Sequence, residues 1–104
     1  MTQEFWDHFA EYCKTPGVDS GKARSYAKAI EYLCDFLNIT QMDTQAVSWV
    51  KSLEADIYNK NSPLYQSLLL FLIGRGQKSY LEGGYIKAAL KYFFAFCQIG
   101  RAHV

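Results

Sequence analysis

The sequence predicts an all-α fold, a compact bundle of four to five helices arranged as two helical hairpins. Three observations lead to this prediction. Apolar residues recur at steps of three and four along most of the chain. No segment alternates apolar and polar residues for long enough to form a strand. The 104 residues are 50% hydrophobic and 16% aromatic, which is enough to pack a single core.

The first helix is expected to begin after Thr2, whose hydroxyl suits an N-cap. It ends at Thr15-Pro16-Gly17, because proline and glycine both oppose continuation of a helix. Its apolar residues fall on one face, which we predict to be buried. That face consists of Phe5, Trp6, Phe9 and Cys13.

The second helix has the clearest pattern in the chain and is capped by Asp19 or Ser20. Charged residues lie off its apolar stripe, so the stripe is predicted to face the core. The stripe consists of Ala23, Tyr26, Ala27, Ile30, Leu33, Cys34 and Leu37.

After a short connection over residues 38–42, Asp43 or Thr44 caps a third helix, with Trp49 toward one side of its apolar face. Asn59 to Asn61 end this helix. The apolar face consists of Val47, Val50, Leu53 and Ile57.

Ser62-Pro63 signals a new helix, an N-cap followed by proline at the first helical position. The apolar run from Leu64 to Ile73 predicts a fourth helix that is buried nearly all round and ends at Gly74. A flexible basic loop then covers residues 74–77, and residues 78–84 hold at most a single helical turn before Gly83-Gly84.

The last helix is expected over Tyr85 to Cys97. Its aromatic residues recur at helical spacing and are predicted to pack inward rather than to stack on a ligand. The predicted inner face consists of Tyr85, Ala89, Tyr92, Phe93 and Phe96.

The sequence lacks the residues that most enzymes need. His8 is the one histidine before residue 99, so neither a histidine-based triad nor a two-histidine metal site can be assembled from residues 1–98. The three widely spaced cysteines form no CxxC pair and are interpreted as buried reduced thiols of a cytoplasmic protein. The longest apolar run, Leu68 to Ile73, is far shorter than the ~20 residues of a membrane span. We therefore expect no metal, no cofactor, no catalysis within this fragment and no membrane insertion.

Charge is divided unevenly along the chain. Residues 1–59 hold five Lys/Arg against nine Asp/Glu, a net charge of −4, whereas residues 60–98 hold five against one, a net charge of +4. If the two hairpins pack side by side, basic residues of both form one face beside Tyr80 and Tyr85 that suits DNA phosphates. The alternative is solvated charge that only balances the acidic half. The candidate DNA-binding residues are Lys22, Arg24, Lys28, Arg75, Lys78, Lys87 and Lys91.

Residues 21–37, with Tyr26, Ile30, Leu33 and Phe36 at helical spacing, resemble the opening of the SAM-like core-binding domain of tyrosine recombinases (phage integrases). The run over residues 88–96 is similar to a later helix of those domains. Residues 78–90 look closer to helical modules that precede HNH nuclease or McrB-like motor domains in bacterial restriction-type proteins. The recombinase resemblance implies a clamp that holds duplex DNA for a following catalytic domain. The chain departs from the pattern in lacking an arginine at the start of the final helix.

These observations lead to one functional expectation and one alternative. We expect a non-catalytic helical module that binds double-stranded DNA, within a larger integrase/recombinase or restriction-type protein. The alternative is a protein–protein interaction or dimerisation module without nucleic-acid binding. In that case Trp6, Trp49 and several tyrosines would anchor the interface.

Residues 99–104, Ile-Gly-Arg-Ala-His-Val, are compatible with the codons ATC GGA AGA GCA CAC GTC, the start of a widely used sequencing adapter. We therefore expect residues 1–98 to be the N-terminal helical domain of a longer protein, and residues 99–104 to be an artefact of sequencing. The alternative is a short natural polar tail.

Overall fold

The computed structural model describes the backbone of residues 1–103 and the side chains of residues 1–98. The all-α prediction is confirmed, and these residues form six helices without a strand. The number exceeds the predicted four to five because residues 79–82 form a helix of their own, and the last helix continues past its predicted end at Cys97. The predicted adapter segment, residues 99–104, lies outside the residues whose side chains are described. The helices are α1 (Gln3–Lys14), α2 (Ser20–Leu37), α3 (Thr44–Tyr58), α4 (Pro63–Gly74), the short α5 (Ser79–Glu82) and α6 (Tyr85–His103).

Side-chain caps begin the first four helices, as the sequence predicts. In each case a hydroxyl or carboxylate oxygen accepts a hydrogen bond from the backbone N–H three residues later, which satisfies a donor that the helix leaves unpaired. Ser62 also donates to the carbonyl of Asp56 at 2.6 Å, so it ties the end of α3 to the start of α4. The four capping residues are Thr2, Asp19, Asp43 and Ser62.

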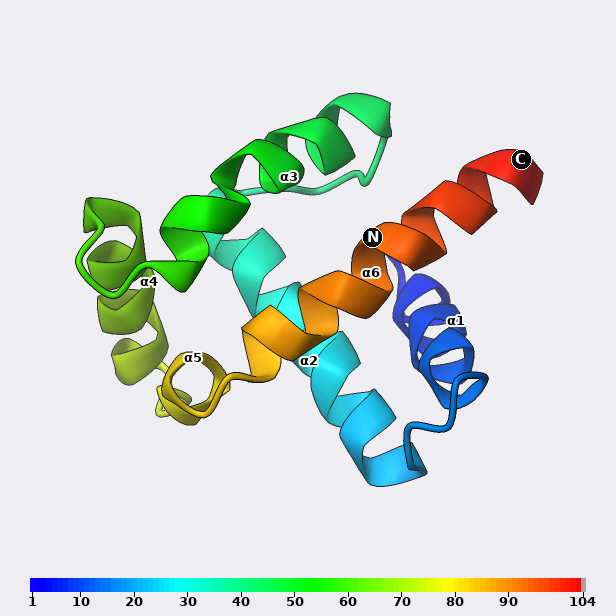
Figure 1. The fold of residues 1–104 in the computed structure, drawn as a ribbon, viewed down its shortest axis with the longest axis horizontal. Helices are drawn as coiled ribbons and strands as arrows, with labels where there is room; N and C mark the ends of the chain where they lie inside the picture. The colour runs from blue at the N-terminus through cyan, green and yellow to red at the C-terminus, as the bar shows by residue number, and fades with distance from the viewer. Residues whose placement is uncertain (104) are drawn as a thin grey trace.

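The centre of the molecule is the crossing of α2 and α6 (Figure 1). α1 packs along α2 and also touches α6, so these three helices enclose one end of the core. α3 packs against α4 and α6, and α4 and α5 close the opposite end (Figure 1). The short helix α5 therefore lies beside the start of α6.

Aromatic rings join α1 to α6. Phe9 and Phe93 are both fully buried, and their ring centroids lie 5.3 Å apart in an edge-to-face arrangement. Phe5 meets Phe93 at 6.3 Å, also edge-to-face, and Trp6 stacks on Phe93 at 6.4 Å. Such geometries are preferred by aromatic quadrupoles, so this cluster fixes how α1 sits on α6. Trp6 is only 4% exposed and therefore belongs mainly to the core, whereas Trp49, the other predicted interface tryptophan, is 46% exposed.

The prediction that α4 is buried nearly all round is wrong. Its buried residues are Tyr65, Leu68 and Leu72, whereas Leu70 is 69% exposed and Ile73 is 50% exposed. The physical reason is position, because α4 lies at the edge of the bundle and has neighbours on one side only (Figure 1).

The predicted inner face of α6 is only partly correct. Ala89 and Phe93 are buried, but Tyr85 is 36% exposed, and Tyr92 and Phe96 are half-buried. The aliphatic side chains of α6 take the central positions and the tyrosines lie at their edge. The missed core residues of this helix are Ile86, Leu90 and Cys97.

Candidate nucleic-acid interface

The seven predicted DNA-binding residues do not form one continuous face. Lys22 lies in the first turn of α2, whereas the Arg75 Nη1 atom is 3.3 Å from Oδ2 of Asp35, near the other end of that helix. Since an α-helix rises 1.5 Å per residue, Lys22 and Asp35 are about 20 Å apart along α2. Arg75 also lies over the Phe71 ring at 4.5 Å. Arg75 thus belongs to a separate surface.

Three further candidates lie beside carboxylates. Arg24 and Lys28 line the groove between α1 and α2 together with carboxylates of both helices. The Lys28 ammonium is 3.6 Å from Glu31. Lys78, on the other side of α2, pairs with Glu82 at 4.0 Å. Exposed pairs of this kind are weak, but they reduce the positive potential that a phosphate would meet.

A smaller group of cations surrounds the start of α6. Within residues 1–98, five lysine or arginine side chains form no ion pair, and four of them lie close to this helix or to the turn before it. We call these four the α6 cations. They are Lys22, Lys60, Lys87 and Lys91.

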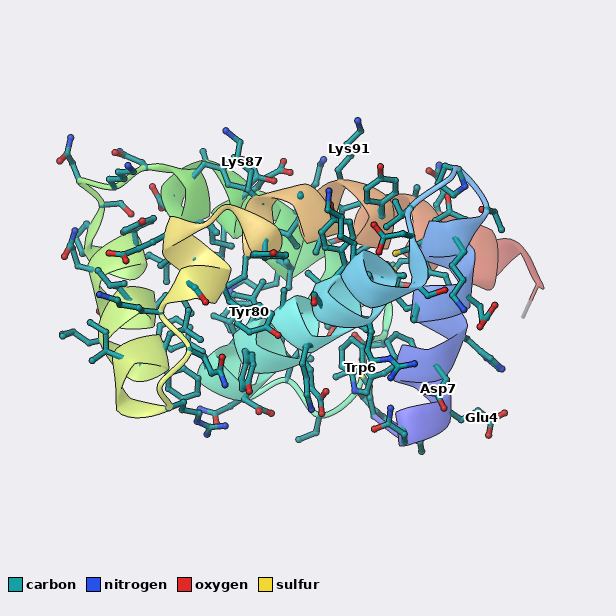
Figure 2. The ribbon with its side chains drawn as sticks, turned by 90° about the horizontal axis from the view of Figure 1, so that it is seen from below. Glu4, Trp6, Asp7, Tyr80, Lys87 and Lys91 are labelled. Carbon is teal, nitrogen blue, oxygen red and sulfur yellow. The ribbon has the colours of Figure 1, made fainter. Side chains whose placement is uncertain are left out.

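The α6 cations flank one turn of the backbone. Lys22 lines a shallow hollow of about 220 Å³ together with Gly84 and Ala88. Lys60 and Lys87 line a second hollow of about 160 Å³ on the other side of Gly84. Lys91 follows Lys87 one helical turn later, and Figure 2 shows both side chains projecting from the same side of α6. Lysines from three segments therefore border the outer side of this helix.

Lys60 is the one α6 cation that was not predicted from the sequence. It lies between α3 and α4, where it is exposed and its carbonyl accepts a hydrogen bond from the Gln66 amide at 2.6 Å. Its proximity to Lys87 arises only because α3 packs against α6. The one available signal was a lysine within a polar helix break.

Two glycines shape the turn that starts α6. A Cβ atom on Gly83 would lie 2.6 Å from the Ser79 carbonyl oxygen, and Gly84 has a φ of +82°, which side chains rarely adopt. The first helical bond of α6 runs from the Ala88 N–H to the Gly84 carbonyl at 3.0 Å. The N–H groups of residues 85–87 find no acceptor within the described chain, so the positive end of α6 opens between the α6 cations.

A row of five tyrosine rings runs beside Lys22 across α2, α5 and α6. The ring centroids of consecutive members are 5.3, 5.6, 6.3 and 5.7 Å apart. Tyr80 and Tyr85, the two members that the sequence analysis named, are adjacent in the row. Within the described chain, these hydroxyls make no hydrogen bond and therefore remain available to water or a ligand. In order, the row is Tyr32, Tyr80, Tyr85, Tyr26 and Tyr92.

Tyr58 supports Lys87 from the opposite side. Its hydroxyl donates to Oε2 of Glu54 at 2.8 Å, and the Lys87 ammonium lies over its ring at 5.3 Å. Burial, together with that hydrogen bond, raises the pKa of Tyr58 above its ordinary value. The neutral phenol adds no negative charge beside Lys87, but Glu82, which pairs with Lys78, lines the same hollow as Lys87.

His8 is exposed on α1, with its Nε2 atom 3.9 Å from Glu4. In the described part of the chain, no group of three or more His, Cys, Asp or Glu side chains is placed to hold a metal ion. No described helix combines the length and apolar character needed to cross a membrane.

Burial of the cysteines should make the free energy of unfolding decrease at alkaline pH. Cys13 and Cys34 are 0% and 2% exposed, and desolvation raises their pKa values to about 11 and about 12. An unfolded thiol ionises near pH 8.5. Between these pH values the native state therefore binds more protons than the unfolded state. The stabilisation from the neutral buried thiols is complete below about pH 8.5 and is lost as the pH rises toward 11.

We expect urea unfolding to report a lower free energy of unfolding at pH 10 than at pH 7. The double substitution Cys13→Ala/Cys34→Ala should weaken this pH dependence, although it also lowers stability at pH 7. All other residues are common to both proteins, so their contribution cancels in the comparison. Equal pH slopes for the two proteins would show that the thiols are not its source.

Comparisons of the chain with protein-family models, curated proteins and solved structures found no match. The resemblance to recombinase core-binding domains therefore stays a prediction.

Proposed function

We propose that this domain is a non-catalytic module that binds double-stranded DNA through phosphates, with the α6 cations as its principal contacts. The observation that carries the proposal is that four lysines without carboxylate partners flank the start of α6. Phosphate contacts supply most non-specific affinity for DNA.

The backbone at the start of α6 adds to this electrostatic argument. Unpaired N–H groups at a helix N-terminus are directed toward ligands, and the helix dipole favours an anion there. Gly84 carries no side chain that would keep a phosphate away from them. The hydroxyls of Tyr26 and Tyr85, which line the same hollow as Lys22, are further phosphate donors. Such contacts position a duplex without reading its sequence.

The test is a fluorescence-anisotropy titration of labelled duplex DNA at several salt concentrations between roughly 50 and 200 mM. Lysines that contact phosphate each release counterions, so Lys87→Gln/Lys91→Gln should weaken binding to duplexes of unrelated sequence alike. It should also reduce the slope of log affinity against log salt by about two.

The matched control is Lys51→Gln/Lys78→Gln, which removes the same net charge. Both of these lysines pair with carboxylates, Lys51 with Glu54 at 3.3 Å and Lys78 with Glu82 at 4.0 Å. The control should leave the salt slope nearly unchanged. Equal losses of affinity in the two double variants would show that binding depends on net charge alone and not on the α6 cations. A wild-type domain that binds no duplex at low salt would refute the proposal.

A further inference from the structure

A groove of about 540 Å³, open to solvent, lies between α1 and residues 20–31 of α2. Its lining includes the apolar or small side chains of Trp6, Ala10 and Ala27, and charged residues line both helices. None of the α6 cations lines it. It is therefore distinct from the proposed DNA-binding surface.

The two walls of the groove carry opposite charge, although α1 and α2 run in opposite directions from their connection (Figure 1), so Lys14 and Glu31 lie toward opposite ends of the groove. α1 contributes residues at positions i, i+4 and i+7 with the signs minus, minus, plus, and α2 contributes the same spacing with plus, plus, minus. Residues with this spacing lie on one face of a helix. The α1 wall consists of Asp7, Glu11 and Lys14, and the α2 wall consists of Arg24, Lys28 and Glu31.

Within one molecule, these charges form no ion pair across the groove. No ion pair among the described side chains joins one wall to the other. Lys14 and Lys28 pair only within their own helices, with Glu11 at 2.9 Å and Glu31 at 3.6 Å. Arg24 has no carboxylate partner, and Asp7 has only the amide of Gln3 at 3.0 Å. A ligand that brings the complementary pattern can therefore satisfy both walls at once.

We propose that this groove is the interface of a symmetric homodimer. A two-fold axis that runs along the groove exchanges its walls, so α1 of one copy faces α2 of its partner. The acidic wall then meets the basic wall twice, as an isologous interface requires. The partner that carries this complementary pattern is a second copy of the chain itself, which also explains why both signs are present in one groove.

In this dimer, Asp7 and Glu11 of each copy lie against the basic wall of the other, and the small side chains of Ala10 and Ala27 let the helices approach. Guanidinium groups pair with carboxylates in a planar, two-bond geometry, so Arg24 is the residue whose loss should matter most. Exposed ion pairs are individually weak and screened by salt, so association should weaken as ionic strength rises.

The experiment is sedimentation velocity of the full chain over a concentration series at low salt, with two wall-reversing variants. Arg24→Glu/Lys28→Glu makes both walls acidic, and Asp7→Lys/Glu11→Lys makes the α1 wall fully basic. Each variant alone should stay at the monomer mass of 11.9 kDa, because like charges then face each other. An equimolar mixture should regain twice that mass. Circular dichroism checks that both variants remain helical.

The control is Lys51→Glu/Lys78→Glu, which changes net charge as much as Arg24→Glu/Lys28→Glu but lies outside the groove. It should dimerise like the natural sequence. The proposal is overturned by a wild-type chain that is monomeric throughout the series, by either groove variant dimerising alone, or by a mixture that stays monomeric. Lys87→Gln/Lys91→Gln should still dimerise, so loss of DNA binding and loss of the dimer are separate results.

Discussion

Replacement of Phe93 by alanine is expected to lower the free energy of unfolding by about 3–5 kcal/mol, a large part of the total stability of a domain this size. The ring is completely buried and contacts Phe5, Trp6 and Phe9 of α1 across the helix junction. Its removal forfeits the transfer free energy of the ring. It also leaves a cavity that three rings on a single helix cannot collapse to fill.

Urea unfolding followed by circular dichroism measures this loss, with Phe94→Ala as the neighbouring control. Phe94 is only half-buried, and one side of its ring is covered by the Lys51 ammonium at 4.6 Å. Its truncation should therefore cost less than half as much. Similar losses at the two positions would contradict the burial of Phe93 in the aromatic cluster that joins α1 to α6.

The helix boundaries could be predicted because they depend on local chemistry. Asp19, Asp43 and Ser62 satisfy N–H groups three residues away, and Pro16 and Gly17 follow directly after the end of α1. The inner faces of α1 and α2 were also largely predictable, since apolar and polar residues alternate there with a helical period.

The orientation of α4 and α6 could not be predicted in the same way. In α4 nearly every side chain is apolar, so periodicity cannot distinguish Leu68 from Leu70. In α6 aromatic and aliphatic residues compete for the core, and Ile86 lies inward while Tyr85 lies at the surface. These choices depend on which neighbour each helix meets, which is a property of the tertiary packing.

The same limit applies to the candidate sites. A sequence shows that Lys28 and Lys87 are basic, but it does not show that the first has a carboxylate partner and the second has none. Lys60 joins Lys87 only through the packing of α3 on α6. The sequence shows that charged residues recur at i, i+4 and i+7 in α1 and in α2. It does not show that the two sets line one groove, because this depends on the packing of α1 against α2.

The clearest test of the α4 orientation is a pair of identical substitutions two residues apart. Leu68→Ala is expected to lower the free energy of unfolding by about 2–5 kcal/mol, because Leu68 is fully buried. Leu70→Ala should change it by no more than about 0.5 kcal/mol, because Leu70 is 69% exposed and loses little buried area. Helix propensity changes equally in both variants and cancels in the comparison.

Urea midpoints measured at constant protein concentration distinguish the two outcomes. A difference of about 2 kcal/mol or more between the variants places one face of α4 against α2, α3 and α5 and the other in water. Equal losses would mean that Leu70 is also covered in solution, by a second copy or by another protein. Because Leu70 lies outside the α1–α2 groove, that result would identify a second interface, and a midpoint that rises with protein concentration would assign it to self-association.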